Sequence, residues 1–189
     1  MSDHFPGRSR RRATSPDAGD VSHRGQSLVE FAIILPLFLL IFMGIIQLGL
    51  LFSAHIGLIN GVREAARYGS LSPTTASNQT GNGSAIENYL STTVLPTSVI
   101  AYSSANLRAS SVTYCAYQNP GSGSPATHSV RLTVTARYAH PLFIPMVGAI
   151  LDGFDGALDG ALAITTMEHF RVENLPLNPG EVTGMTTCP

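Results

Sequence analysis

The feature that most constrains this chain is an uninterrupted apolar run near its N-terminus, from Phe31 to Phe52. The run has 22 residues, no charged side chain and one strongly polar side chain, Gln47. At about 1.5 Å of rise per residue, a helix of this length crosses a hydrocarbon core of roughly 30 Å. The sequence therefore predicts a single membrane-spanning helix.

Arginine is distributed unevenly around this run. Five arginines precede it: Arg8, Arg10, Arg11, Arg12 and Arg24. Only Arg63 and Arg67, opposed by Glu64, follow it closely. Because positive charge is retained on the cytoplasmic side of a membrane, we expect a cytoplasmic N-terminus and an extracytoplasmic segment 53–189 in the cell envelope. A cleaved secretory signal is the alternative, but its apolar core has about 7–15 residues and its cleavage site needs a small residue where Phe52 stands.

The amino-acid composition argues against several classes of function. Charged residues make up 12% of the chain, hydrophobic residues 44%, and the formal net charge is −1. These values argue against a disordered polyelectrolyte and against general nucleic-acid binding. The six histidines are scattered, and no spacing typical of a metal site, a hydrolase or a phosphate-binding loop occurs. We therefore expect no metal, cofactor or small-molecule substrate, and an enzyme is the least supported class.

An acidic stretch in the C-terminal half of the chain contains Asp152, Asp155 and Asp159, each followed by glycine. A calcium loop needs a different order of acidic residues and a closing Glu. An acidic turn is therefore favoured over a calcium site.

Another acidic residue, Glu30, stands directly before the apolar run, five residues after Gly25 and six before Pro36. A carboxylate at the centre of a bilayer costs roughly 2.5–3.5 kcal/mol and less toward the interface, so a simple anchor gains nothing from it. Two explanations remain open. Glu30 is either an interfacial residue favoured by the helix dipole, or a carboxylate that awaits a positive partner in the membrane.

Residues 24–68, from RGQSLVEF through the apolar run to VREAARYG, resemble the N-terminus of the TadE-like family. These are small pilin-like proteins of the Tad (Flp) branch of type IV pilus systems. The family pattern is a glycine, a short spacer, a Glu followed by an aromatic or small residue, and an apolar helix with an early proline. Gly25, Glu30, Phe31 and Pro36 match that pattern.

The resemblance implies that a prepilin peptidase in the membrane cuts between Gly25 and Gln26 on the cytoplasmic side. Glu30 would then become the fifth residue and pair with the new α-amino group of a neighbouring subunit. Pairing relieves the desolvation of both charges, so Glu30, together with Phe31 and Pro36, is expected to set subunit register during assembly.

The function implied by the resemblance is that of a minor pilin-like protein, or pseudopilin, of Tad/Flp-type pilus assembly. It would pack in the membrane against pilins, other pseudopilins and inner-membrane assembly proteins. The assignment is minor rather than major because Tad major pilins are much smaller and lack such a head. The alternatives are an uncleaved single-pass anchor that presents an extracytoplasmic binding domain and, third, a membrane-tethered enzyme of unrecognised type.

The apolar run continues into an amphipathic segment. Its apolar residues recur at helical spacing and predict one stripe, formed by Ile56, Ile59, Val62 and Ala66. We expect one helix from about Ser27 to Tyr68, kinked or loosened at Pro36, as the stem of a pilin-like fold. A short juxtamembrane helix without special role is the alternative.

We expect three parts: a basic cytoplasmic leader at 1–25, the transmembrane helix and stem at 26–68, and an extracytoplasmic head at 69–189. The polar stretch Ser72–Ala85 is predicted as a loop. A short helix is expected at Ile86–Leu95.

Strand signals dominate the rest of the head. Alternating residues at 112–117 and 130–138 predict a β-hairpin with one buried and one exposed face. A third strand is expected at Ala161–Arg171. The apolar piece 140–151, broken by two prolines, is expected to form a loop or short helix, and the tail from Asn174 is expected to be irregular. The predicted fold class is α+β, a long N-terminal helix followed by a small, mostly antiparallel head.

The chain has two cysteines, Cys115 in a predicted strand and Cys188 next to the C-terminus. In an oxidising compartment a bridge between them would close about 70 residues and stabilise the fold by roughly 4 kcal/mol. Two separate thiols are the alternative, because spacing alone does not fix a pairing.

Overall fold

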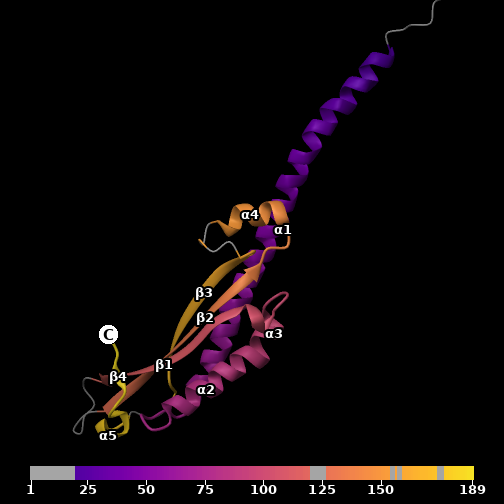
Figure 1. Cartoon of the computed structure of the whole chain (residues 1–189). Helices are drawn as coiled ribbons and strands as arrows, with labels where there is room; N and C mark the ends of the chain where they lie inside the picture. The colour runs from indigo at the N-terminus through magenta and orange to yellow at the C-terminus, as the bar shows by residue number, and fades with distance from the viewer. Residues whose placement is uncertain (1–19, 120–126, 154–155, 157–158, 174–176) are drawn as a thin grey trace, which may run out of the picture. The chain divides into compact units, whose positions relative to one another are not determined.

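The computed structural model describes residues 20–119, 127–153, 156, 159–173 and 177–189 (Figure 1). It confirms the α+β class: a long N-terminal helix is followed by a small four-stranded sheet with short helices. Most of the predicted leader and the turn of the predicted hairpin lie outside the described residues. The elements in chain order are α1 (Asp20–Ser70), α2 (Gln79–Tyr89), a π-helical turn (Leu90–Val94), α3 (Leu95–Ser98), a 3-10 turn (Ser104–Asn106), β1 (Leu107–Asn119), β2 (Thr127–Pro141), α4 (Pro145–Asp152), β3 (Ala161–Arg171), α5 (Pro179–Val182) and β4 (Thr186–Thr187).

The chain divides into two compact units inside α1, after Leu39. The described part of the first unit consists of α1 alone, whereas the second unit holds the rest of α1 and every other element. The helix begins at Asp20 rather than near Ser27, and it continues through Pro36. Proline lacks the backbone N–H that would donate a helical hydrogen bond, and α1 continues past this missing bond without a break.

The sheet has the strand order β3-β2-β1-β4. Strands β1, β2 and β3 are antiparallel neighbours, so the predicted hairpin and third strand are confirmed. The alternation of β2 is also confirmed: its apolar side chains are buried and Arg131, Thr133, Thr135 and Arg137 lie on the opposite, more exposed face. The short β4 pairs with β1 in parallel.

The core lies between this sheet and the helices. Helix α1 contributes Ala54, Leu58, Val62, Ala65 and Ala66. The second helical segment, which runs from α2 through the π-helical turn to α3, contributes Ile86, Leu90 and Leu95. Strand β2 contributes Val130, Leu132, Val134, Ala136 and Tyr138. The second unit therefore has one continuous apolar core.

The stripe predicted for the stem is partly wrong. Val62 and Ala66 are buried as expected, but Ile56 is 58% exposed and Ile59 is only half-buried. The buried face includes small residues that a hydropathy pattern underweights. Because those small residues allow close approach, they fix which face of α1 meets the head.

The predicted loop Ser72–Ala85 is too long, because α2 already begins at Gln79. The amide of Asn82 donates hydrogen bonds to the carbonyl of Pro73 (3.2 Å) and the hydroxyl of Thr74 (3.0 Å). Gly83 is buried against β1. These tertiary contacts outweigh the low helix propensity of Gly and Asn in this stretch.

The expectation of an irregular tail is also wrong for its described part. The backbone N–H of Asn178 donates to the Glu181 carboxylate at 2.7 Å, which forms part of a capping box at the start of α5. The N–H of Cys188 donates to the carbonyl of Ala116 at 3.0 Å, beyond the end of β4. The tail is therefore held on the edge of the sheet.

Candidate functional site

The residues predicted for processing and register all lie on α1 in the first unit. Gly25, Gln26, Glu30, Phe31 and Pro36 are exposed there. The side-chain amide of Gln26 donates to a Glu30 carboxylate oxygen at 3.1 Å, an (i, i+4) contact on one helix face. A Cβ built on Gly25 meets nothing within 4 Å. The structure thus brings Gln26 and Glu30 together on an open helix surface.

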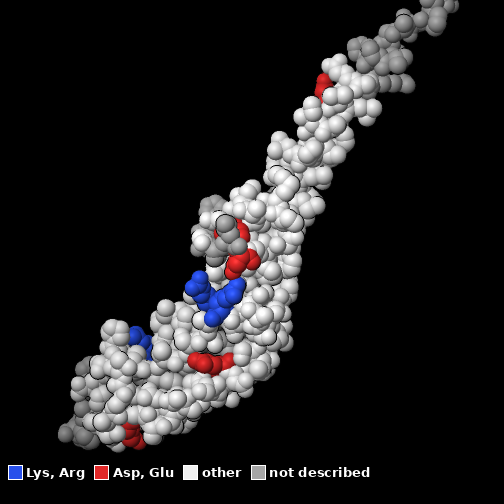
Figure 2. Space-filling model, viewed as in Figure 1, with Lys and Arg blue, Asp and Glu red and all other residues white. Residues whose placement is uncertain are grey.

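The Glu30 carboxylate stands at the start of a long apolar surface. Large apolar side chains are exposed along α1 from Leu28 to Phe52, and the visible surface of this stretch carries almost no charge (Figure 2). Among the described residues, α1 is the one helix long and apolar enough to cross a membrane. Its length and surface are those of a membrane anchor.

Beyond the apolar run, the buried face of α1 includes a row of small residues at intervals of four. A Cβ on Gly57 would lie 2.1 Å from the Ser98 carbonyl oxygen, and one on Gly61 would lie 2.9 Å from a methyl carbon of Leu95. A Cβ on Gly69 would lie 2.3 Å from the Cδ1 atom of Ile86. The second helical segment therefore packs directly on the backbone of the stem.

The stripe predicted from the sequence missed this face because it was based on hydropathy alone. The signal was present: Gly57 and Gly61 are four apart, and Ala65 and Gly69 continue the interval. This spacing places small side chains on one helix face and permits close helix packing.

Gln47, the polar residue of the apolar run, is fully buried. Its side-chain oxygen accepts hydrogen bonds from the backbone N–H groups of Phe143 (3.0 Å) and Ile144 (3.2 Å), which directly precede α4. Its side-chain nitrogen has no hydrogen-bond partner among the described residues. A residue near the C-terminal end of the apolar run thus holds a segment 96 positions further along the chain.

His140, in the same region of the head, is buried and makes an edge-on contact with the ring of Phe143 at a centroid distance of 5.8 Å. Neither ring nitrogen has a hydrogen-bond partner within the described part of the chain. Burial lowers the pKa of His140 below its ordinary value of 6.5, because desolvation disfavours the charged ring. Burial therefore favours the neutral form of His140.

A salt bridge ties the stem to the far edge of the sheet. The Arg63 guanidinium lies 2.8 Å from the Glu168 carboxylate, with the two side chains 58% and 24% exposed. Exposed pairs of this kind contribute only about 0.2–1 kcal/mol. The bridge orients the stem more than it stabilises the fold.

Cys115 and Cys188 form a disulfide, with an S–S distance of 1.99 Å and a separation of 73 positions. The bridge lies beside the parallel pairing of Cys115 with Thr186. It fastens the C-terminal tail to the outer edge of β1.

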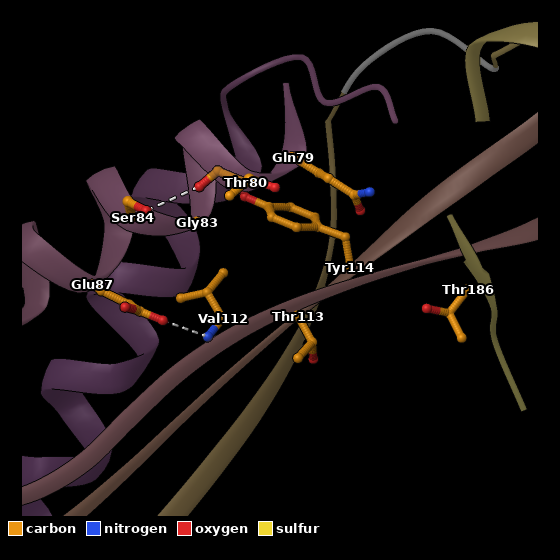
Figure 3. Close-up of a pocket in the computed structure, with 9 residues that line it drawn as sticks. All are labelled: Gln79, Thr80, Gly83, Ser84, Glu87, Val112, Thr113, Tyr114 and Thr186. Atoms are coloured by element: carbon orange, nitrogen blue, oxygen red, sulfur yellow. Dashed lines mark hydrogen bonds between the residues drawn. The ribbon is translucent and has the colours of Figure 1, made fainter. Parts of the chain in front are cut away.

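A groove of about 330 Å³ lies between α2, β1 and β4 (Figure 3). Its acidic residue, Glu87, accepts a hydrogen bond from the backbone N–H of Val112 at 3.1 Å. Its serine, Ser84, donates to the backbone carbonyl of Thr80 at 3.1 Å. Burial raises the pKa of Tyr114, which also lines the groove. The nine residues that line it bring no nucleophile next to a base.

In the acidic stretch, a hydrogen bond from the backbone of Gly160 to the Asp152 side chain holds the two ends of a loop together. Both carboxylate oxygens of Asp152 lie 3.1 Å from the backbone N–H of Gly160. Asp159 pairs with Arg108 at 2.7 Å, whereas Asp155 lies outside the described residues. Within the part of the chain that the structure describes, no group of three His, Cys, Asp or Glu side chains is placed to hold a metal.

Residues 25–67 match the family model of TadE-like proteins. The resemblance stated from the sequence is thus confirmed over the segment that contains Gly25, Glu30 and nearly all of the stem. The match supports a Tad pilus-associated protein of a structural rather than an enzymatic family. No curated protein and no solved structure matches the chain.

Proposed function

We propose that this chain is a minor pilin-like, or pseudopilin, component of Tad/Flp-type pilus assembly. The observation that carries the proposal is the position of the family match. It covers a glycine, an exposed carboxylate five residues later and a continuous apolar helix, which are the parts needed for processing and for packing in a membrane.

The proposed orientation has the N-terminus in the cytoplasm and the head outside. The arginines at 8–12 and at 24 favour a cytoplasmic leader. The disulfide between Cys115 and Cys188 supports an extracytoplasmic head, because disulfides persist in oxidising compartments.

Cleavage between Gly25 and Gln26 by a prepilin peptidase would create an α-amino group with a pKa of about 7.7–8.0, largely cationic at neutral pH. On the open surface around Glu30, the ammonium of a neighbouring subunit finds a carboxylate bonded to a neutral amide. A charged pair at the membrane edge is stabilised more strongly than one in water, since the local dielectric constant is lower. Glu30 would thereby set the register between adjacent helices.

The first experiment identifies the mature N-terminus of the membrane-bound protein from its native host by terminal peptide mass spectrometry. We expect Gln26 as the first residue. Gly25→Leu should block processing, whereas Gly44→Leu should not, although a Cβ at either glycine meets nothing within 4 Å. Processing of Gly25→Leu at the same position would contradict the proposed site.

The second experiment separates assembly from processing. Glu30→Gln should leave a processed protein that no longer supports surface pili, because the amide lacks the negative charge. Glu64→Gln, an exposed substitution of the same kind on the same helix, serves as the control and should support normal pili. Normal piliation with Glu30→Gln would remove the register role.

The second candidate is an uncleaved single-pass anchor that presents the head at the cell envelope. The observation that favours it is the continuation of α1 from Asp20 through Gly25, since a peptidase needs an accessible, unwound backbone at the bond it cuts. A mature chain that begins at residue 1 or 2, in a host with active prepilin peptidase, would select this function over the first.

A further inference from the structure

The segment around α4 belongs to the head, but its amino-acid composition is typical of a segment that contacts a membrane. From Ala139 to Leu151 it contains no Asp, Glu, Lys or Arg. Its one titratable side chain, His140, is buried, and burial favours the neutral ring. The stretch is therefore electrically neutral.

Its depth is fixed by Gln47. The side-chain oxygen of Gln47 accepts the backbone N–H groups of Phe143 and Ile144, so the start of α4 lies beside α1 at the level of Gln47 (Figure 1). Gln47 lies five residues before Phe52, the C-terminal end of the apolar run. At about 1.5 Å per residue, this places the start of α4 about 7–8 Å inside the end of that run. Interfacial helices bury their apolar faces about 5–10 Å deep.

Helix α4 turns an apolar face outward. Met146 and Ile150 are 68% and 62% exposed, and their spacing of four residues places them on one face of α4. Phe143, two residues before the helix begins, is 51% exposed. Val147 and Gly148 on the opposite side are buried. On α1, Phe52 is 63% exposed as well.

The backbone before α4 is sealed as a lipid environment demands. Pro141 and Pro145 have no N–H group. The N–H of Leu142 donates to the carbonyl of Gly160 at 2.9 Å, and the next two N–H groups donate to Gln47. Every backbone donor from 141 to 145 is thus absent or bonded, which meets the donor part of the condition for placing irregular backbone at membrane depth.

We propose that α4 is a membrane-seated helix, with Phe143, Met146 and Ile150 inserted into the lipid bilayer beside α1. The proposal rests on α1 spanning the membrane, and it adds a second membrane contact made by the head itself. A lipid surface fits these side chains better than a protein, because two of them on an eight-residue helix and one directly before it fall far short of the roughly 800 Å² per partner that a stable protein interface buries.

The chain has no tryptophan, so a single introduced one reports its own surroundings. We would place the full chain in phosphatidylcholine vesicles with unbrominated or acyl-brominated lipid and compare tryptophan emission. Met146→Trp is the test, and Ile150→Trp repeats it at a second site. Met167→Trp is the matched control, since Met167 is 54% exposed on β3. Phe52→Trp reports whether α1 itself is inserted.

We expect blue-shifted emission, strongly quenched by brominated lipid, for the tryptophans at positions 146, 150 and 52. The tryptophan at position 167 should keep its emission. Quenching at position 52 without quenching at 146 and 150 would overturn the membrane-seated helix while leaving the anchor intact. Absence of quenching at position 52 would overturn both.

Discussion

The close packing of the stem leads us to predict that replacing a helical glycine by alanine lowers stability, the opposite of the usual effect. Gly57→Ala should destabilise the head even though Ala is the better helix former. The new Cβ would lie 2.1 Å from the carbonyl oxygen of Ser98 and 2.9 Å from its carbonyl carbon. An ordinary C···O contact is about 3.3–3.6 Å, so the end of α3 would have to move by more than about 1 Å.

The magnitude follows from what this movement disturbs. Leu95 and Val99, on either side of Ser98, are buried in the core. Overpacking a core costs about 1–3 kcal/mol, and a backbone obstacle belongs to the upper part of that range. The helix-propensity gain of Ala over Gly, about 1 kcal/mol, offsets part of it. We expect a net loss of about 1–2 kcal/mol, and roughly 2–4 °C in Tm per kcal/mol for a unit of this size.

Two other glycines provide graded controls. At Gly69 the obstacles are the side-chain ends of Ile86 and Leu132, which can rotate, so Gly69→Ala should cost less than Gly57→Ala. At Gly81 on α2 the new Cβ meets nothing within 4 Å, so Gly81→Ala should raise stability by about 0.5–1 kcal/mol.

The assay is thermal unfolding of the full chain in detergent micelles. Circular dichroism monitors the loss of structure in the head. The reasoning predicts the order Gly81→Ala, wild type, Gly69→Ala, Gly57→Ala from most to least stable. A Gly57→Ala protein at least as stable as wild type would show that α3 does not pack on the stem at that distance.

Three further changes test other parts of the head. Replacing both Cys115 and Cys188 by Ser should lower its stability by about 4 kcal/mol, because the bridge closes a loop of 73 positions; chemical unfolding with and without reductant checks this. Gln47→Leu leaves the two backbone N–H groups before α4 unpaired and should cost about 1–3 kcal/mol for each, with faster hydrogen exchange around α4 as the readout. Because burial lowers the pKa of His140, stability should be complete above the unfolded value of about 6.5 and fall as the pH drops below it. His140→Leu should flatten the Tm profile between about pH 7.5 and 5.5; an unchanged profile would assign the dependence to other groups.

Much of the sheet could be predicted because its signal is local. Strand β2 alternates apolar and polar residues over nine positions, and a slip of one residue would expose Leu132 and bury Arg131. The pattern therefore fixed the faces of the strand. The third strand was equally clear, and its bounds Ala161–Arg171 agree with the structure.

The rest depended on contacts between distant segments. Gly81 and Gly83 indicated a loop, but α2 forms because it packs on β1. The tail carried a short capping-box signal at Asn178 and Glu181 that went unused. The hydrogen bond between Gln47 and Phe143, just before α4, joins residues 96 positions apart. No local sequence pattern predicts such a contact.

The stem shows why hydropathy alone misjudged which face meets the head. A lipid tail and a protein core are similarly apolar, so the two surroundings of α1 give the same hydropathy signal. The placement of small residues separates them: Ala54, Gly57 and Gly61 are buried beside Leu58 and Val62, whereas Phe52 and Ile56 stay exposed. The small-residue face, which a bare membrane helix would use for close packing, is already occupied by α3 at Gly57 and Gly61 and by α2 at Gly69. If this chain packs against another subunit as proposed, this stretch of the stem has to use the opposite face, where Ile56 is exposed.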